Sequence, residues 1–186
     1  NCYICESITN GSLEDVIEID AASNNGVDEI RDIRDKSTYA PSLAKHKVYI
    51  IDEVHMLSTG AFNALLKTLE EPTENVVFIL ATTELHKIPA TILSRVQRFE
   101  FKSIKLPDIF QHLENILATE GIAYEADAVQ IIARRAEGGM RDALSILDQA
   151  LSLTAGSELT TAIAEEITGS ISLAALDQYV AAILAH

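Results

Sequence analysis

The chain has 186 residues, 48% hydrophobic and 23% charged, which is enough apolar material for one globular domain or two small ones. Its formal net charge of −14 excludes broad electrostatic coating of DNA, so any contact with nucleic acid must be local or shared with partner subunits. With no apolar run of 18 residues and only two cysteines, the sequence predicts no membrane span and no disulfide framework, and we expect a reducing, cytoplasmic setting.

The first residues, "NCYICESITNG", contain both cysteines and neither a charged leader nor an apolar segment, so no signal peptide is predicted. Because they begin without Met, inside a C-x-x-C pair, we interpret them as the cut edge of a longer protein. Residues 15–20, "DVIEID", predict a short strand. A turn at Asn24, Asn25 and Gly26 follows, and a helix with acidic residues in its first turn begins near Val27.

The next segments alternate between strand and helix. Residues 47–52, "KVYIID", are a continuous apolar run, which is typical of a strand buried on both faces of a parallel sheet. Residues 58–72 predict an amphipathic helix, and residues 75–83, "NVVFILATT", predict a second buried strand. A short helix at 90–97 and a last strand at 98–101, "RFEF", complete the alternation, which predicts a parallel α/β sheet with right-handed crossovers.

From about Lys105 onward the pattern is helical, and most segments end at a glycine. Together these segments predict a small all-helical domain. Its helices are expected at residues 106–121, 125–139, 140–156 and 159–169. Residues 170–186 predict one further helix, which would open a third unit.

Asp52 and Glu53 stand where the 47–52 strand emerges at its carboxyl end, the edge at which open α/β sheets bind ligands. One carboxylate there can hold Mg²⁺, and its neighbour can orient a water for in-line attack on a γ-phosphate. Alone, the pair fits equally well a strand that simply ends in a turn. A buried apolar run into D-E-x-H is more specific than a stray pair of acids, and this favours the nucleotide interpretation.

Three further residues invite a functional interpretation, although each also has a structural one. The Thr83 hydroxyl, at the end of the second buried strand, can bond a phosphate or the attacking water, but two threonines at a strand end are the simpler explanation. Arg95 can reach a phosphate in a neighbouring subunit or form a surface ion pair. Arg141 opens a helix, where its charge opposes the helix dipole, so it indicates a bound phosphate or a surface Arg–Asp network.

Together, D-E-x-H, A-T-T, S-R and G-G-M-R-D-A-L-S occur in an order and spacing that resembles the bacterial DNA polymerase III gamma/tau family, the AAA+ motor of the clamp loader. The resemblance covers nearly the whole chain, including "KVYIIDEVHMLS" and "HKIPATILSRVQRFEF". It implies a partial AAA+ P-loop-type parallel α/β sheet with flanking helices, followed by a small all-helical lid domain. The implied domains are the end of the ATPase core at 1–103, with a zinc-module remnant at 1–11, the lid at 104–169 and the start of a collar at 170–186.

The resemblance also implies a role for each of these residues. Asp52 would be the Walker B magnesium residue, and Glu53 the general base or water-orienting residue. Thr83 would be sensor 1 and Arg141 would be sensor 2, reaching the nucleotide from the lid. Arg95 would be an arginine finger that acts in trans on ATP held by the next subunit. The implied cofactors are therefore ATP and Mg²⁺.

In the family, helix starts on the inner surface of a ring grip DNA, so Arg31, Lys67 and Thr91 are candidate DNA contacts. For Lys67, a solvated charge opposite the apolar stripe of its helix is a serious competing explanation. Cys2 and Cys5 match the end of the family's four-cysteine zinc module. Because a structural zinc needs about four ligands, we expect no well-bound zinc from this chain alone, but Zn²⁺ at these sulfurs in the intact protein.

Two departures from the family pattern bear on activity. The finger motif usually reads S-R-C, whereas Val96 follows Arg95 here, and valine fills a similar small volume, so we expect little effect. The phosphate-binding loop, G-x-x-x-x-G-K-[ST], would precede Asn1 in the family and does not occur in these residues. We therefore expect the chain alone not to hydrolyse ATP, although the intact protein would be an ATPase.

Three functional hypotheses follow. The first is a motor subunit of the replicative clamp loader, which uses ATP to load the sliding clamp onto primer–template DNA. Its implied partners are the other clamp-loader subunits in a pentameric ring, the sliding clamp, the DNA and the polymerase core, with no membrane. The second is a non-hydrolysing AAA+ scaffold that supplies an arginine finger, which the intact acid pair disfavours. The third is a D-E-x-H helicase fragment, which would need a second α/β motor domain where helices are predicted.

Overall fold

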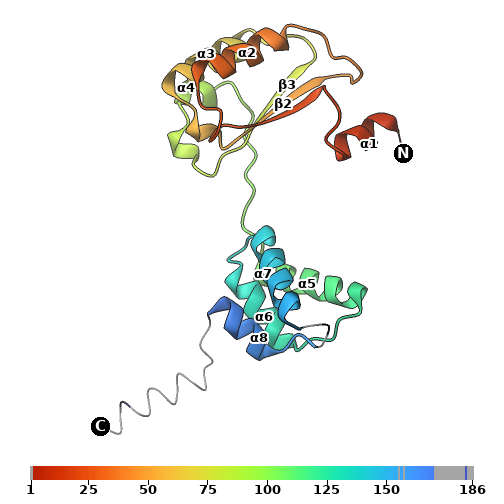
Figure 1. The fold of residues 1–186 in the computed structure, drawn as a ribbon. Helices are drawn as coiled ribbons and strands as arrows, with labels where there is room; N and C mark the ends of the chain where they lie inside the picture. Colours follow the sequence, from red (N-terminus) through yellow and green to blue (C-terminus); the bar gives the residue numbers. More distant parts are fainter. Residues whose placement is uncertain (1, 155, 157, 170–182, 184–186) are drawn as a thin grey trace. The chain divides into compact units, whose positions relative to one another are not determined.

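The computed structural model describes residues 2–154, 156, 158–169 and 183. Contacts divide the chain into two compact units, Asn1–Phe99 and Glu100–His186, and each is described by itself. The first is an α/β unit and the second is helical, in the order that the sequence predicts (Figure 1). None of the helices in the described ranges is both long and apolar enough to cross a membrane.

A parallel sheet with the strand order β1-β2-β3 organises the first unit. The register pairs Asp20 with Asp52, so the carboxyl ends of β1 and β2 lie at the same edge. In chain order the helices and strands are α1 (Tyr3–Thr9), β1 (Val16–Asp20), α2 (Val27–Ser37), β2 (Lys47–Asp52), η1 (Val54–Met56), α3 (Thr59–Glu70), β3 (Val76–Leu80), η2 (Leu85–Lys87) and α4 (Ala90–Leu93).

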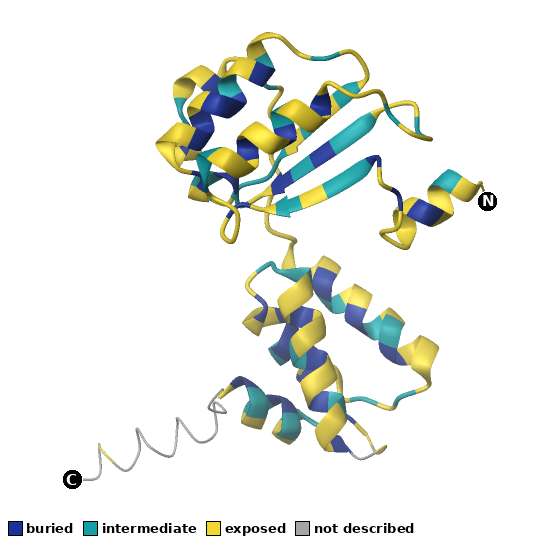
Figure 2. Ribbon diagram, turned by 45° about the horizontal axis from the view of Figure 1, so that its top comes forward, coloured by how far each residue is buried: buried dark blue, intermediate teal, exposed yellow. Residues whose placement is uncertain are grey.

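The core of this unit lies between the sheet and its amphipathic helices. Tyr49 and Ile51 of β2 belong to one buried cluster with Ile30 of α2 and Leu65 of α3. Buried and exposed positions alternate along both helices (Figure 2), as expected for helices that turn one side toward a sheet. At the start of α3, the Ser58 Oγ accepts the Ala61 N–H at 3.2 Å and caps the helix.

The opposite face of the sheet is not covered by the helices of this unit, so the expectation that β2 and β3 are buried on both faces is wrong for the described chain. Val77 and Ile79 of β3 are 42% and 48% exposed, and Ile50 of β2 pairs with Ile79 and is half-buried. The reason is the two-residue period of a strand. Alternate side chains point to opposite faces, and the core cluster of α2, α3 and α4 takes up one of them.

Residues 98–101 form no strand, contrary to the prediction from "RFEF". They pair with none of the three strands, and Phe99 and Phe101 are 73% and 95% exposed. Alternation in a sequence predicts which side chains would share a face. A strand nevertheless forms only where its backbone N–H and C=O groups find a neighbouring strand, and this segment has none among the described residues.

A buried carboxylate fixes the loop that leads into β2. Asp15 is 1% exposed, and its oxygens accept the backbone N–H groups of Ser42, Leu43 and Ala44 at 2.7, 2.7 and 2.8 Å. Burial alone would raise the pKa of Asp15, but the three N–H donors lower it below its ordinary value. This contact could not be predicted from the sequence, because the partners are about 28 positions away in the chain.

We expect Asp15→Asn to lower the free energy of unfolding by about 2–4 kcal/mol, because an amide offers N–H groups to backbone donors that need an acceptor. Urea unfolding followed by circular dichroism measures the loss, and Asp32→Asn, at an exposed position of α2, is the matched control. The folded pKa is depressed, so the contribution of Asp15 is present above its unfolded pKa and is lost as the pH falls through its folded pKa. Equal stability of both variants would contradict this account.

The second unit is a helical bundle in its described part. One buried cluster unites its helices and includes Leu113, Ile132, Leu147 and Ala164. The helices are α5 (Leu106–Glu120), α6 (Ala126–Arg135), α7 (Met140–Thr154) and α8 (Thr161–Thr168). They correspond to the four that the sequence predicts, whereas the helix predicted at 170–186 lies, apart from residue 183, outside the described residues.

Candidate active site at the carboxyl edge of the sheet

The predicted acids and threonine emerge beside one another where β2 and β3 end. Backbone pairing continues past the strands, because the Ala81 N–H donates to the Ile51 carbonyl at 2.9 Å. The Val54 N–H in turn donates to the Ala81 carbonyl at 2.9 Å. These two bonds hold the segment after β3, which carries Thr83, next to the end of β2, which carries Asp52 and Glu53.

Asp52 is exposed at this edge, and its Oδ1 accepts the Glu53 N–H at 2.9 Å. This bond fixes the direction of the carboxylate. Carboxylate oxygens are ligands that Mg²⁺ prefers in proteins, and an exposed one at the carboxyl edge of a parallel sheet suits a metal that also binds phosphate. The chemistry of Asp52 therefore fits a magnesium ligand, and that role stays a prediction.

Glu53 adopts a left-handed backbone conformation, with φ 46° and ψ 43°. A non-glycine residue in this region costs about 1–2 kcal/mol, so the surrounding structure has to hold it there. The side chain is 37% exposed, and its Oε2 accepts the Thr83 hydroxyl at 3.3 Å. The structure thus brings together the two residues that the sequence assigns to the attacking water and to sensor 1.

His55 adds a contact that sequence reasoning missed. Its side chain is 8% exposed, and its Nδ1 lies 3.0 Å from the Thr82 Oγ1 and 3.2 Å from the Glu53 Oε2. The Nε2 lies 3.2 Å from the Glu84 Oε2. The one signal in the sequence was the D-E-x-H spacing, to which no role for the histidine was attached.

Glu84 carries a second ion pair, with Lys87 three residues further along η2. The hydrogen bond from Lys87 lowers the pKa of Glu84 below its ordinary value, with a smaller contribution from the charge of His55. Glu84 is therefore an ionised acceptor at neutral pH, on the far side of the His55 ring from Glu53.

Arg95 follows the short helix α4 and contacts neither Asp52, Glu53 nor Thr83. Its guanidinium donates to the Glu70 carboxylate at the end of α3 at 2.7 Å and to the Thr91 carbonyl at 2.8 Å. The ion pair is partly exposed on both sides. A finger that acts on a neighbouring subunit would have to leave Glu70, so the surface ion pair that the sequence left open is the arrangement in the single chain.

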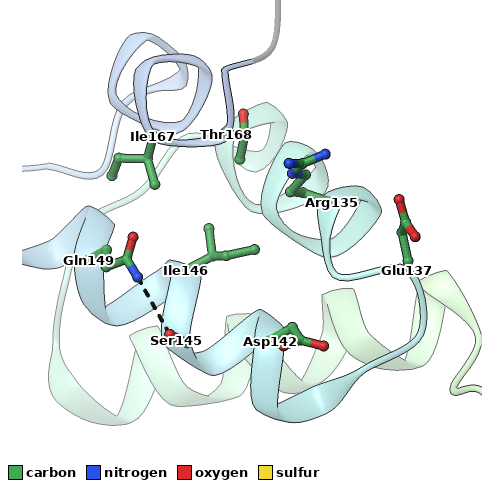
Figure 3. Close-up of a pocket in the computed structure, with 8 residues that line it drawn as sticks. All are labelled: Arg135, Glu137, Asp142, Ser145, Ile146, Gln149, Ile167 and Thr168. Atoms are coloured by element: carbon green, nitrogen blue, oxygen red, sulfur yellow. Dashed lines mark hydrogen bonds between the residues drawn. The ribbon is translucent and has the colours of Figure 1, made fainter.

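Arg141 belongs to the second unit and is exposed in the first turn of α7. An open cleft of about 450 Å³ lies in the same unit, and its lining includes Arg135, Glu137 and Asp142 (Figure 3). Its polar lining includes two carboxylates and one guanidinium, which disfavours a triphosphate. We therefore do not assign the nucleotide to this cleft, and Arg141 does not line it.

The three candidate DNA contacts lie on three different helices of the first unit. Arg31, on α2, forms an exposed ion pair with Asp28 at 3.0 Å. Lys67 lies in the last turn of α3, so the expectation that it stands at a helix start is wrong. It is exposed and has no ion-pair partner in the described part of the chain. Thr91, on α4, is exposed. No hydrogen bond or ion pair joins these three residues to one another, and their role in binding DNA stays a prediction.

Cys2 and Cys5 lie close together at the start of α1, with their sulfurs 3.2 Å apart. The Cys5 N–H lowers the pKa of the Cys2 thiol, whereas the neighbouring Cys2 raises the pKa of Cys5. Across the described residues, no group of three or more His, Cys, Asp or Glu side chains is placed to hold a metal. Two sulfurs are at most half of the ligands that a tetrahedral zinc site needs, so zinc at these cysteines stays a prediction.

Comparison with known families finds two matches along the chain. Residues 1–105 match a family model described as DNA polymerase III, delta subunit. Residues 108–156 match one described as DNA polymerase III clamp loader subunit, ATPase lid domain. The two matched regions are the α/β unit and most of the helical unit.

Curated relatives agree with these matches. The DNA polymerase III subunit tau of Bacillus subtilis is 63% identical over 171 residues, which are 92% of this chain and 30% of the relative. The subunit of the same name from Escherichia coli is 52% identical over 162 residues, 87% of this chain and 25% of the relative. The chain thus spans less than a third of the length of these two proteins.

Among solved structures, the Holliday junction branch migration motor RuvB of Thermotoga maritima superposes with a TM-score of 0.67 at 16% sequence identity. The match covers 91% of this chain and 60% of that one. At this identity the likeness concerns the fold alone. It confirms the predicted fold class, a partial AAA+ parallel sheet with flanking helices followed by a helical lid.

Proposed function

The chain belongs to the gamma/tau family of bacterial DNA polymerase III subunits, and from this premise we propose that the protein containing it is an ATP-driven motor subunit of the clamp loader. In this proposal ATP binding orders a pentameric ring that opens the sliding clamp. Primer–template DNA then triggers hydrolysis, which releases the closed clamp on the DNA. The ring would also contact the polymerase core, in the bacterial cytoplasm.

The observation that carries the proposal is the grouping of Asp52, Glu53 and Thr83 at one sheet edge, with the Thr83 hydroxyl 3.3 Å from the Glu53 Oε2. When bound, Mg²⁺ would neutralise charge on the triphosphate. Asp52 would ligate it, while Glu53 would accept a hydrogen bond from the attacking water and turn the water's oxygen toward the γ-phosphate. Thr83 would keep Glu53 in that orientation.

Other parts of the machine would complete the site. The backbone cradle for the triphosphate would come from residues outside this chain, and Arg141 would approach the nucleotide from the lid. Arg95 would act on ATP in the next subunit, where a guanidinium stabilises the charge of the transition state. Cys2 and Cys5 would be two of the four ligands of a structural Zn²⁺.

DNA would be held by few groups rather than by overall charge. Arg31, Lys67 and Thr91 lie on separate helices and offer two cations and a hydroxyl, groups that can follow phosphates without reading sequence. Such local contacts are compatible with a formal net charge of −14. Arg31 would have to exchange its partner Asp28 for a phosphate.

The direct test is phosphate release by the intact protein, assembled with its partner subunits, with and without sliding clamp and primer–template DNA. A motor subunit gives ATP turnover that rises when both are added. Rings that assemble and bind the clamp but show no turnover would overturn the proposal, and would favour a scaffold subunit that supplies Arg95 to another site.

A further inference from the structure

We propose that His55 is a positioning residue: it holds the Glu53 carboxylate in its working orientation and connects it to Glu84 on the segment after β3. The inference rests on the proposed ATPase function, in which Glu53 orients the attacking water. It concerns a residue that touches neither nucleotide nor metal in that proposal and acts through Glu53.

The first argument is the burial of a polar ring. The His55 side chain is 8% exposed, and a buried imidazole needs hydrogen-bond partners for both nitrogens. Both nitrogens face oxygens, namely Glu53 and Thr82 at Nδ1 and Glu84 at Nε2. Because ionised carboxylates only accept hydrogen bonds, a ring nitrogen that bonds Glu53 or Glu84 does so as the donor, and the tautomer decides which nitrogen carries the proton.

The second argument is how the Glu53 carboxylate is engaged. Its Oε2 accepts the Thr83 hydroxyl at 3.3 Å and lies 3.2 Å from the His55 Nδ1. Within the described residues, no hydrogen bond or ion pair engages the Oε1, which leaves that oxygen for a water. One anchored oxygen and one available oxygen is the arrangement that a water-orienting carboxylate needs.

The third argument is that the residues that contact His55 are themselves fixed by further contacts. Glu84 binds the Nε2 and is held in turn by Lys87. The backbone N–H of Glu84 also donates to the Thr82 Oγ1 at 3.0 Å, so the Thr82 hydroxyl that faces His55 is fixed as well. The segment after β3 thus contacts both ring nitrogens, through Thr82 and Glu84, and restricts the orientation of the ring. The fixed ring in turn restricts the Glu53 side chain, which would otherwise sample several rotamers.

Three substitutions in the intact, assembled protein separate a positioning role from simple filling of space. His55→Leu keeps the bulk and removes both ring nitrogens, and we expect its kcat to fall about tenfold with nucleotide affinity within about twofold of the parent. His55→Asn places an amide N–H near the Nδ1 position and should retain most of kcat. His55→Gln places it near the Nε2 position, reaches Glu84 only, and should resemble the leucine variant.

A purely structural histidine predicts a different order, with His55→Leu closest to the parent and His55→Asn the most damaged, and that order would overturn the inference. His112→Leu, which removes an exposed histidine of α5, is the matched control and should leave kcat unchanged. Glu53→Gln separates this failure from failure of the proposed function. If Glu53→Gln leaves turnover intact, the function is wrong; if it abolishes turnover while His55→Leu does not lower kcat, only the inference about His55 is wrong. Thermal unfolding of each variant verifies that it is folded.

Discussion

Replacing Glu53 with glutamine in the intact protein should lower ATP turnover by about 10²–10⁴-fold while ATP binding stays within about twofold of the parent. Glutamine has the shape of glutamate, so the left-handed turn at φ 46° and the neighbouring Thr83 are retained. What is lost is the negative charge that attracts a proton of the attacking water. Steady-state phosphate release gives the turnover, and titration with a fluorescent ATP analogue gives the affinity.

Glu120→Gln is the control for this substitution, because Glu120 is an exposed residue at the end of α5, in the other unit. It changes the same functional group and the net charge by the same amount, and it should leave turnover unchanged. Full turnover by the Glu53→Gln protein would contradict the assignment of the water-orienting residue. Loss of binding together with turnover would mean that Glu53 contributes to nucleotide affinity instead.

The sequence predicted the edge of the sheet well because that edge is specified by short-range signals. An apolar run followed directly by Asp52 and Glu53, and a second run followed by Thr83, both predict strands that end in polar residues. Parallel pairing brings the carboxyl ends of adjacent strands to the same edge. The proximity of Asp52, Glu53 and Thr83 could therefore be predicted without any knowledge of side-chain contacts.

The contacts within the site could not be predicted in the same way. His55 meets Glu84 through a distance of 29 positions in the chain, and only the folded path of the segment after β3 brings the two together. The left-handed backbone of Glu53 is likewise set by its surroundings, because nothing in the residue type favours that region. The motif D-E-x-H contains Asp52, Glu53 and His55, but it does not predict the contacts that these side chains make.

The incorrect strand at 98–101 and the open face of β3 share a physical cause. A local sequence pattern predicts the strand that a segment would form if an adjacent strand or helix were available to pair with it or cover it. "RFEF" alternates, but no strand pairs with it among the described residues, and Val77 and Ile79 are apolar although the helices of their unit pack on the opposite face. The neighbour itself is a property of the tertiary structure and cannot be inferred from a segment alone.

Arg95→Ala should lower ATP turnover of the assembled ring by about 10³-fold, the scale of an arginine finger that acts in trans, and should leave the isolated subunit at its basal rate. In the single chain the guanidinium is held by Glu70 at 2.7 Å and makes no contact with Glu53 or Thr83. Its removal therefore cannot disturb hydrolysis within one subunit through a direct contact. Phosphate release by ring and monomer measures both rates, with the exposed Arg98→Ala as the control.

Mixing two inactive proteins makes the test decisive. In a ring assembled from Arg95→Ala and Glu53→Gln subunits, some interfaces join an intact Glu53 in one subunit to an intact Arg95 in the next. If Arg95 acts in trans, these interfaces restore part of the turnover that either variant lacks alone. If Arg95 acts within its own subunit, every subunit still lacks one of the two groups, and no mixture can recover activity. Recovery thus requires the two residues to meet across an interface, which is the arrangement that a ring motor needs.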